Sequence, residues 1–335
     1  MSNFKAWISA ARPRTLPLSI SGIILGSCYA YGYNAFAKAV LLLGSPQTND
    51  VINQPILFVK FNWWIPVLAL ITTLGFQVLS NFANDYGDGV KGTDNDDRIG
   101  PMRAIQSGLI SAVQMKRAMI ITACLTAVSA ISLIYVSLGL EQLITSLFFL
   151  VLGVAAIWAA IKYTVGDNAY GYRGLGDVFV FIFFGPVSVI GVYYLIASQL
   201  EWLLLLPSLT IGLLSVAVLN LNNMRDIESD RKAGKNTIPV KIGITNAKRL
   251  HYSFIAIALI SIIAYIFIII KTLGNVVGDT EWLWLPILVL PMLLVHIITV
   301  YRNKVPALLD PELKKVALST FFIAILTIIA TARVY

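Results

Sequence analysis

The spacing between charged residues constrains this chain more than any other feature of its sequence. Uncharged windows of at least 17 residues occur nine times, at 15–37, 61–84, 118–140, 142–161, 178–200, 202–224, 250–270, 282–301 and 316–332. A helix needs about 17–25 mostly apolar residues to cross the hydrocarbon core of a bilayer. Backbone in lipid must satisfy its own hydrogen bonds, and the windows lack the alternation of barrel strands. We therefore expect an all-α polytopic membrane protein, with residues 1–335 as a single domain.

Composition excludes the other broad classes of protein. Hydrophobic residues make up 58% of the chain and charged residues 13%, against about 25% charged in a soluble domain. Cys28 and Cys124 both lie in apolar runs, so they form neither a disulfide framework nor a metal-ligand spacing. Residues 1–28 weakly resemble a signal peptide, but the eight windows that follow favour a first transmembrane helix.

Lysine and arginine predict how the chain is oriented in the membrane. With nine spans and a cytoplasmic N-terminus, 21 of the 25 basic residues fall on the cytoplasmic side and four on the other side. This bias is the positive-inside pattern, and it places the C-terminus on the opposite side. The basic residues occupy separate loops instead of one patch, so the net charge of +8 does not indicate nucleic-acid binding.

Two cytoplasmic loops hold eight of the twelve acidic residues predicted on that side, and each begins where a span ends. The first loop has Asn81 four residues before Asp85 and continues to Asp88. The second has Asn222 four residues before Asp226 and continues to Asp230. Asn81 and Asn222 are separated by 141 residues, and so are Asp85 and Asp226, which indicates a weak internal repeat.

Helical spacing predicts that each cluster presents an amide and two carboxylates at the depth of the lipid headgroups. Acids just beyond a span are commonly solvated, and asparagines in spans commonly join helices. Two clusters with the same spacing instead favour a shared site for a hard cation. Mg²⁺ typically takes one or two carboxylates together with substrate phosphates. A ligand with a diphosphate head and a hydrocarbon tail would match both the acids and the apolar helices.

The two acidic segments and their surroundings resemble the intramembrane aromatic prenyltransferases of the UbiA superfamily. The stretches 84–108 and 170–177 resemble its naphthoate-prenylating branch, which belongs to menaquinone synthesis. The resemblance implies nine helices around a central cavity with a lateral opening to lipid. It also implies Mg²⁺ bound by the four aspartates Asp85, Asp88, Asp226 and Asp230. The segment 38–60 is longer than the resemblance leads us to expect, and it falls on the far side, away from these acids.

The resemblance implies transfer of a polyprenyl group from polyprenyl diphosphate to 1,4-dihydroxy-2-naphthoate, with loss of diphosphate and CO₂, giving demethylmenaquinone. Candidate catalytic residues are Lys162, Asp177 and Arg225. Candidate substrate-binding residues are Asn81, Asn84, Arg98, Arg103, Tyr163, Arg173, Asn222 and Asn223. The cations among them could stabilise the leaving diphosphate, and aromatic faces could stabilise an allylic cation. Asp177 could orient or deprotonate the acceptor. Lys162 fits a topological marker equally well, and Arg98 and Arg103 fit solvated loop charges.

Two other functions remain open at this point. One is a prenyltransferase for a different aromatic acceptor, such as 4-hydroxybenzoate. The other is a secondary transporter, although transporters usually place polar sites near the bilayer midplane, and every window here is uncharged. We expect a bacterial inner-membrane protein with its site facing the cytoplasm, with the lipid bilayer and its substrates as partners. Neither nucleic acid nor an obligate protein partner is indicated.

Overall fold

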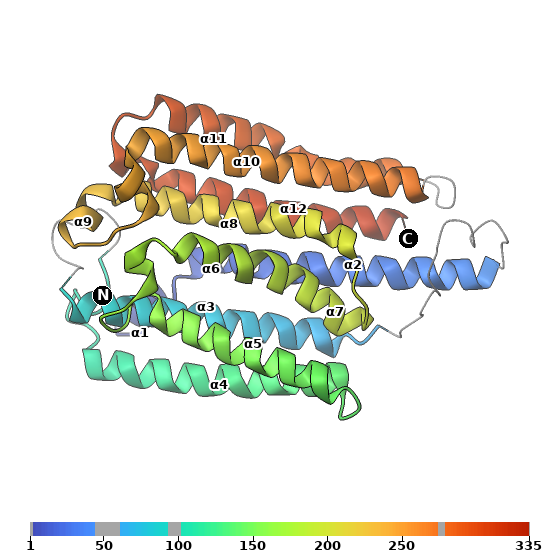
Figure 1. The fold of residues 1–335 in the computed structure, drawn as a ribbon, viewed down its shortest axis with the longest axis horizontal. Coiled ribbons are helices and arrows are strands. Elements are labelled where there is room, and N and C mark those ends of the chain that lie inside the picture. The colour runs from blue at the N-terminus through green and yellow to red at the C-terminus, as the bar shows by residue number, and fades with distance from the viewer. Residues whose placement is uncertain (1–2, 44–60, 93–101, 274–278, 335) are drawn as a thin grey trace.

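The computed structural model describes residues 3–43, 61–92, 102–273 and 279–334, and nearly all of them are helical. Long helices lie side by side and form an elongated bundle (Figure 1). In chain order the elements are α1 (Asn3–Ala11), η1 (Pro13–Thr15), α2 (Leu16–Leu43), α3 (Trp64–Val90), α4 (Ala112–Leu138), α5 (Leu143–Lys162), η3 (Tyr170–Arg173), α6 (Gly176–Ile182), η4 (Phe183–Gly191), α7 (Val192–Ala197), η5 (Trp202–Leu204), α8 (Leu205–Arg225), α9 (Ile227–Lys232), α10 (Ile238–Leu273), η6 (Thr280–Val289), α11 (Leu290–Arg302), η7 (Pro306–Leu309) and α12 (Asp310–Val334). Arg98 and most of the 38–60 segment lie outside the described residues.

The expected fold class, an all-α polytopic membrane protein, agrees with this architecture. Within the described ranges, eight helical segments are long and apolar enough to cross a membrane. The first window, 15–37, falls within α2, which is helical but is not one of those eight. The count of nine spans therefore stays a prediction.

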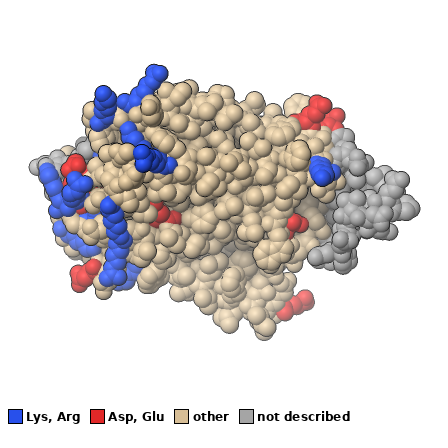
Figure 2. All heavy atoms as spheres, turned by 45° about the horizontal axis from the view of Figure 1, so that its top comes forward, with Lys and Arg blue, Asp and Glu red and all other residues tan. Residues whose placement is uncertain are grey.

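The two ends of the bundle differ in charge. Helices α1 and α9 lie at one end, and α12 finishes at the other end (Figure 1). Figure 2 shows that most of the lysine and arginine side chains on the visible face gather at the end that holds α1 and α9. The structure thus separates the basic residues as the positive-inside pattern requires. The direction in which the bundle faces across the membrane remains a prediction.

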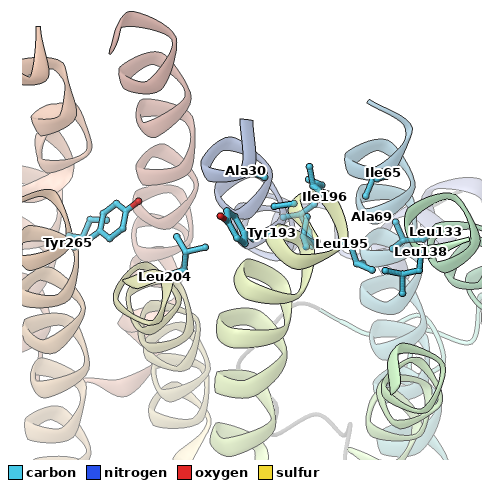
Figure 3. Close-up of a cluster of buried hydrophobic side chains, with 14 of the residues drawn as sticks. Ala30, Ile65, Ala69, Leu133, Leu138, Tyr193, Leu195, Ile196, Leu204 and Tyr265 are labelled. Atoms are coloured by element: carbon cyan, nitrogen blue, oxygen red, sulfur yellow. The ribbon is translucent and has the colours of Figure 1, made fainter. Parts of the chain in front are cut away.

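Helix α8 is central and helix α5 is peripheral. In the apolar part of α8, 61% of the residues are buried inside the protein, against 6% in α5. A cluster of buried apolar side chains, including Ala30, Leu133 and Tyr193, joins α2, α3, α4 and α7 (Figure 3). Small residues allow the closest approaches. A Cβ added to Gly26 on α2 would lie 2.3 Å from the carbonyl oxygen of Val189.

The acidic segments lie at the ends of α3 and α8. Helix α3 continues beyond the apolar window to Val90, so the first acidic segment is itself helical. The second segment spans a break, because α8 ends at Arg225 and α9 begins at Ile227, with Asp226 between them at φ −95° and ψ 12°. The two segments therefore reach the same end of the bundle with different local geometry.

Candidate active site

One cavity of about 560 Å³ inside the bundle is lined by residues of both acidic segments. Its polar part is lined by Asn81, Asn84, Asp88, Asn222, Asn223, Asp226 and Asp230, among others. Its apolar part is lined by residues that include Ile23, Ala69, Leu133, Phe149 and Leu195. Along α3 the lining runs from Asp88 to Ala69, about 28 Å at 1.5 Å per residue. The cavity suits a ligand with a charged head and a long apolar tail.

The Asp88 carboxylate is held by donors from two other parts of the chain. The hydroxyl of Tyr172 donates a hydrogen bond of 2.8 Å to Oδ1, and the ammonium of Lys235 lies 3.0 Å from Oδ2. Tyr172 comes from η3, and Lys235 follows α9. The pair between Lys235 and Asp88 joins residues 147 positions apart and so connects the two acidic segments directly.

The Asp226 carboxylate is held by its neighbour in sequence. The guanidinium of Arg225 donates from Nε and Nη2 to the two carboxylate oxygens at 2.8 and 2.6 Å. The same group donates to Asn222 Oδ1 at 2.9 Å and pairs with Asp310 at the start of α12. The Arg225 side chain is fully buried and does not line the cavity. A fork of this kind fixes the direction in which a carboxylate points.

Asp230 differs from these two acids. Asp230 is buried, with only 9% of the residue exposed. Its carboxylate nevertheless makes no hydrogen bond or ion pair with the described residues. Burial raises the pKa of Asp230 to about 7; the ammonium of Lys235 opposes this rise, and the carboxylates of Asp226 and Asp88 add to it. The three acids are therefore close enough to influence one another, as expected for carboxylates that share a cation.

Asp85 lies elsewhere, contrary to the expectation that it shares a face with Asn81 and Asp88. It does not line the cavity, and its Oδ2 accepts a hydrogen bond of 3.2 Å from the backbone N–H of Ala104. The cavity-facing stripe of α3 contains Gln77, Asn81, Asn84 and Asp88, spaced by three or four residues. Asp85 follows Asn84 by one residue, a rotation of about 100° that turns it toward the segment after residue 102.

Among the residues that the structure describes, five basic ones also line the cavity. Arg12 and Arg14 come from the turn between α1 and α2, Arg103 precedes α4, Lys235 follows α9, and Lys314 lies on α12. Arg12 has a positive φ of 50°, a backbone conformation that few residues other than glycine adopt. These cations surround the acids and suit a ligand that carries several negative charges.

The remaining candidates from the sequence divide into two groups. Asn81, Asn84, Asn222, Asn223, Arg103 and Tyr163 line the cavity, whereas Lys162, Arg173, Asp177 and Arg225 do not. Arg173 is exposed and donates to Asn168 Oδ1 at 2.7 Å. Asp177 is buried, and its Oδ2 has no hydrogen-bond partner among the described residues. The structure therefore does not bring Lys162, Asp177 and Arg225 together at the cavity surface.

Aromatic rings form part of the cavity wall. Tyr163 meets Tyr170 edge to face at 5.4 Å, Tyr170 stacks on Phe179 at 4.1 Å, and Phe179 stacks on Phe183 at 6.5 Å between ring centroids. All four residues line the cavity. Burial raises the pKa of the Tyr163 phenol far above its usual range, so this ring stays neutral. Neutral aromatic faces of this kind can stabilise a cation beside them.

The donor set fits a magnesium ion that is completed by a bound phosphate ligand. Within the described residues, no three Asp, Glu, His or Cys side chains are grouped closely enough to hold a metal by themselves. Oxygen donors from both acidic segments nevertheless line one cavity, and Mg²⁺ usually needs only one or two carboxylates besides phosphate oxygens. Asp88, Asp226 and Asp230 are the carboxylates of these segments that can supply such ligands.

Several residues of this site carry no distinguishing signal in the sequence. Lys235, Tyr172, Arg12, Arg14, Asp310 and Lys314 all line the cavity. Lys235 is one of seven basic residues between positions 225 and 249, and nothing in the pattern distinguishes it from the others. Tyr172 lies in the 170–177 stretch that carried the resemblance, and this is the one signal that pointed toward it.

Comparison with known proteins gives concordant results. The UbiA prenyltransferase family matches residues 58–329. The chain is 40% identical to 1,4-dihydroxy-2-naphthoate octaprenyltransferase of Escherichia coli strain K12, covering 94% of this chain and 91% of that protein. It is 27% identical to human UbiA prenyltransferase domain-containing protein 1, covering 86% of this chain and 72% of the relative.

Solved structures with the same fold include two archaeal proteins. The apo structure of a UbiA homolog from Aeropyrum pernix K1 matches with a TM-score of 0.59 and 15% identity, covering 92% of this chain and 98% of the other. A UbiA homolog from Archaeoglobus fulgidus, bound to DMAPP and Mg²⁺, matches with a TM-score of 0.54 and 16% identity, covering 96% and 99%. At such identities the likeness concerns the fold alone.

Proposed function

Because the chain belongs to the UbiA prenyltransferase family, we propose that it transfers a polyprenyl group from polyprenyl diphosphate to 1,4-dihydroxy-2-naphthoate. Diphosphate and CO₂ leave, and the immediate product is the quinol form of demethylmenaquinone, since no oxidant takes part. The observation that carries this proposal is the 40% identity, over nearly the whole chain, with a relative named for the naphthoate reaction. Family membership also argues against the transporter alternative. We further propose that residues 1–335 form one prenyltransferase domain.

The polar part of the cavity would bind the diphosphate. Asp88, Asp226 and Asp230 would hold Mg²⁺, and the amides of Asn84, Asn222 and Asn223 lie in the same lining. When bound, Mg²⁺ neutralises the charge that builds on the leaving diphosphate. Arg103 and the other four lining cations would bind the outer diphosphate oxygens. Together these groups would place the scissile C–O bond at the boundary between the polar and apolar parts of the cavity.

The aromatic residues that line the cavity would stabilise the positive charge that develops on the donor. As the C–O bond breaks, positive charge develops on the allylic carbon, and the neutral aromatic residues Tyr163, Tyr170 and Phe179 line the same cavity, where they would stabilise it. The electron-rich ring carbon of the acceptor then bonds to this carbon, and its carboxyl group leaves as CO₂. The apolar lining excludes water that would otherwise capture the cation.

The three candidate catalytic residues would act from behind the cavity wall. Arg225 holds the Asp226 carboxylate through two hydrogen bonds and so fixes a ligand instead of touching substrate. Asp177 lies close enough to Tyr163 to raise the pKa of its phenol. Lys162 ends α5 immediately before Tyr163. We propose that all three position cavity residues.

The site would face the cytoplasm of a bacterial inner membrane. This follows from the positive-inside pattern, because 21 of the 25 basic residues belong to the loops on the side of the acidic segments. The apolar helices would place the tail of the donor within the bilayer.

A membrane assay tests the proposed reaction. Membranes that contain the chain would receive Mg²⁺, a labelled polyprenyl diphosphate and, separately, dihydroxynaphthoate or 4-hydroxybenzoate. We expect a prenylated, decarboxylated naphthalene product, identified by its mass. A product from hydroxybenzoate alone would overturn the naphthoate assignment, and tracer uptake into vesicles without any product would favour the transporter.

A further inference from the structure

Lys235 occupies a loop that is fixed to both sides of the cavity mouth. Its backbone N–H donates to the carbonyl of Asp230 at 2.8 Å, and the next N–H, of Asn236, donates to the carbonyl of Tyr172 at 2.9 Å. The loop therefore joins the second acidic segment to η3. This anchoring directs the Lys235 side chain, which is 16% exposed, along the cavity lining.

Lys235 forms an ion pair with Asp88 of the first acidic segment. Its ammonium lies 3.0 Å from Asp88 Oδ2 and 4.9 Å from the centre of the Tyr172 ring. Tyr172 in turn donates to Asp88 Oδ1. Both oxygens of a carboxylate that is only 7% exposed are thus occupied by donors from the protein itself.

Lys91 provides a contrast at the same ring. Its ammonium lies 4.1 Å from the centre of the Tyr172 ring, but it donates to the carbonyls of Thr164 and Gly166 at 3.0 and 2.8 Å. Those bonds connect α3 to the segment after α5 and do not involve a cavity carboxylate. Lys91 does not line the cavity, whereas Lys235 does.

We propose that Lys235 is an exchangeable counter-cation: it pairs with Asp88 as in this structure and would pair with the diphosphate once Mg²⁺ and diphosphate bind. This inference rests on the proposed function, because it takes the cavity to be a magnesium–diphosphate site. A divalent ion at Asp88 would repel the ammonium beside it. A diphosphate oxygen offers the ammonium a new partner, and the flexible lysine stem allows the change.

The exchange has a thermodynamic consequence. Metal that arrives alone must break the pair between Lys235 and Asp88 without any compensation. Metal that arrives with diphosphate breaks the same pair but supplies a new acceptor for the ammonium. Metal and diphosphate should therefore bind with positive coupling, and by linkage each should raise the affinity for the other by the same factor.

The test measures metal binding apart from catalysis. The full chain in nanodiscs would be titrated with Mn²⁺, detected by electron paramagnetic resonance, with and without inorganic pyrophosphate. The variants are Lys235→Met, Lys235→Arg and, as a control with the same change in charge, Lys232→Met on the exposed face of α9. Thermal melting of each variant would establish that it is folded.

In the wild-type chain, we expect pyrophosphate to raise the affinity for Mn²⁺ by about tenfold or more, within the usual range of such couplings. Lys235→Met should bind Mn²⁺ alone about tenfold more tightly and show a smaller coupling than the wild-type chain, and the coupling that remains would come from phosphate oxygens that ligate the metal directly. Lys235→Arg and Lys232→Met should resemble the wild-type chain. A folded Lys235→Met variant with unchanged Mn²⁺ affinity and unchanged coupling would overturn the exchange.

Failure of the proposed function would give a different result. If the wild-type chain does not prenylate the naphthoate but Lys235→Met changes Mn²⁺ binding as expected, then the acceptor assignment is wrong and the exchange stands. If the wild-type chain prenylates the naphthoate and Lys235→Met leaves Mn²⁺ binding unchanged, then only the exchange is wrong.

Discussion

The carboxylate of Asp85 accepts a hydrogen bond from the backbone N–H of Ala104 at 3.2 Å, and this bond turns Asp85 away from the cavity that its neighbour Asn84 lines. Ala104 directly follows Arg103, which does line the cavity. Asp85 therefore anchors the segment that presents a cation to the site, whereas Asp88 faces the cavity itself. Two acids three residues apart on one helix have different tasks.

Neutral substitutions should separate these tasks. Asp88→Asn should lower prenyl transfer by about a hundredfold or more, since losing a metal ligand removes several kcal/mol of stabilisation from the transition state. Asp85→Asn should retain activity within about tenfold, because its amide oxygen can still accept from Ala104. Initial rates, normalised to folded protein, check both. Equal losses in the two variants at unchanged melting temperature would place Asp85 among the metal ligands.

Removal of divalent ions should stop the reaction without unfolding the chain. The cavity carboxylates have partners within the protein or reduced charge: Asp88 pairs with Lys235, Asp226 pairs with Arg225, and burial raises the pKa of Asp230 to about 7. Chelation by EDTA should therefore abolish transfer and leave the melting temperature nearly unchanged, and added Mg²⁺ should restore the rate. Full activity in EDTA would contradict the metal assignment.

Arg225 should affect both stability and metal binding. Arg225→Met leaves Asp226 without its two charged hydrogen bonds in a buried setting, and breaking a buried ion pair on one side costs about 3–5 kcal/mol. We expect a lower melting temperature and a higher Mg²⁺ concentration for half-maximal rate. Arg225→Lys should recover part of the stability but less of the Mg²⁺ affinity, because lysine lacks the two-pronged geometry.

Removal of a different positive charge, away from the cavity, provides the control for Arg225→Met. Arg249→Met removes a positive charge from α10 at a position that does not line the cavity. It should leave the Mg²⁺ requirement unchanged. If Arg225→Met and Arg249→Met shift the requirement equally, Arg225 acts through net charge alone and does not orient Asp226.

The helical architecture was predictable because exclusion of charge from lipid acts on every residue of a span. The approach of the two acidic segments was also predictable, since both begin at the same predicted side of the membrane. The direction of single side chains was not. Asp85 and Asn84 differ by about 100° around α3, and only the packing of neighbouring helices decides which of them faces the cavity.

Contacts between loops that are distant in the chain could not be predicted from the sequence either. Lys235 reaches Asp88 because its loop packs on η3, and no local pattern encodes that packing. Two histidines give a second example. His251 and His296 are 45 positions apart in the sequence, yet their Nε2 atoms lie 2.8 Å apart, and His296 Nδ1 lies 2.7 Å from Glu312 Oε2. This buried network joins α10, α11 and α12, so the two histidines form a polar contact between helices.

The apolar part of the cavity makes a prediction about the donor tail. Gly153 on α5 lines this part, and a Cβ added there would meet no heavy atom within 4 Å. Ala130 and Leu133 on α4, a helix that is itself little buried, also line the cavity. A long tail that follows this route would pass Gly153, whereas a five-carbon donor would end before it.

Gly153→Trp should therefore discriminate between donors by length. We expect the kcat/KM for a long polyprenyl diphosphate to fall by about tenfold or more, while that for dimethylallyl diphosphate changes little, because lost tail contacts of a few methylenes already cost about 1–3 kcal/mol. Leu147→Trp, exposed on the same helix, is the control. If Gly153→Trp keeps wild-type activity with both donors, the tail follows another route. The alternative route lies between α2 and α12, where Leu18 and Ala317 line the cavity. Equal loss with both donors would mean that Gly153 acts on the reacting end of the cavity.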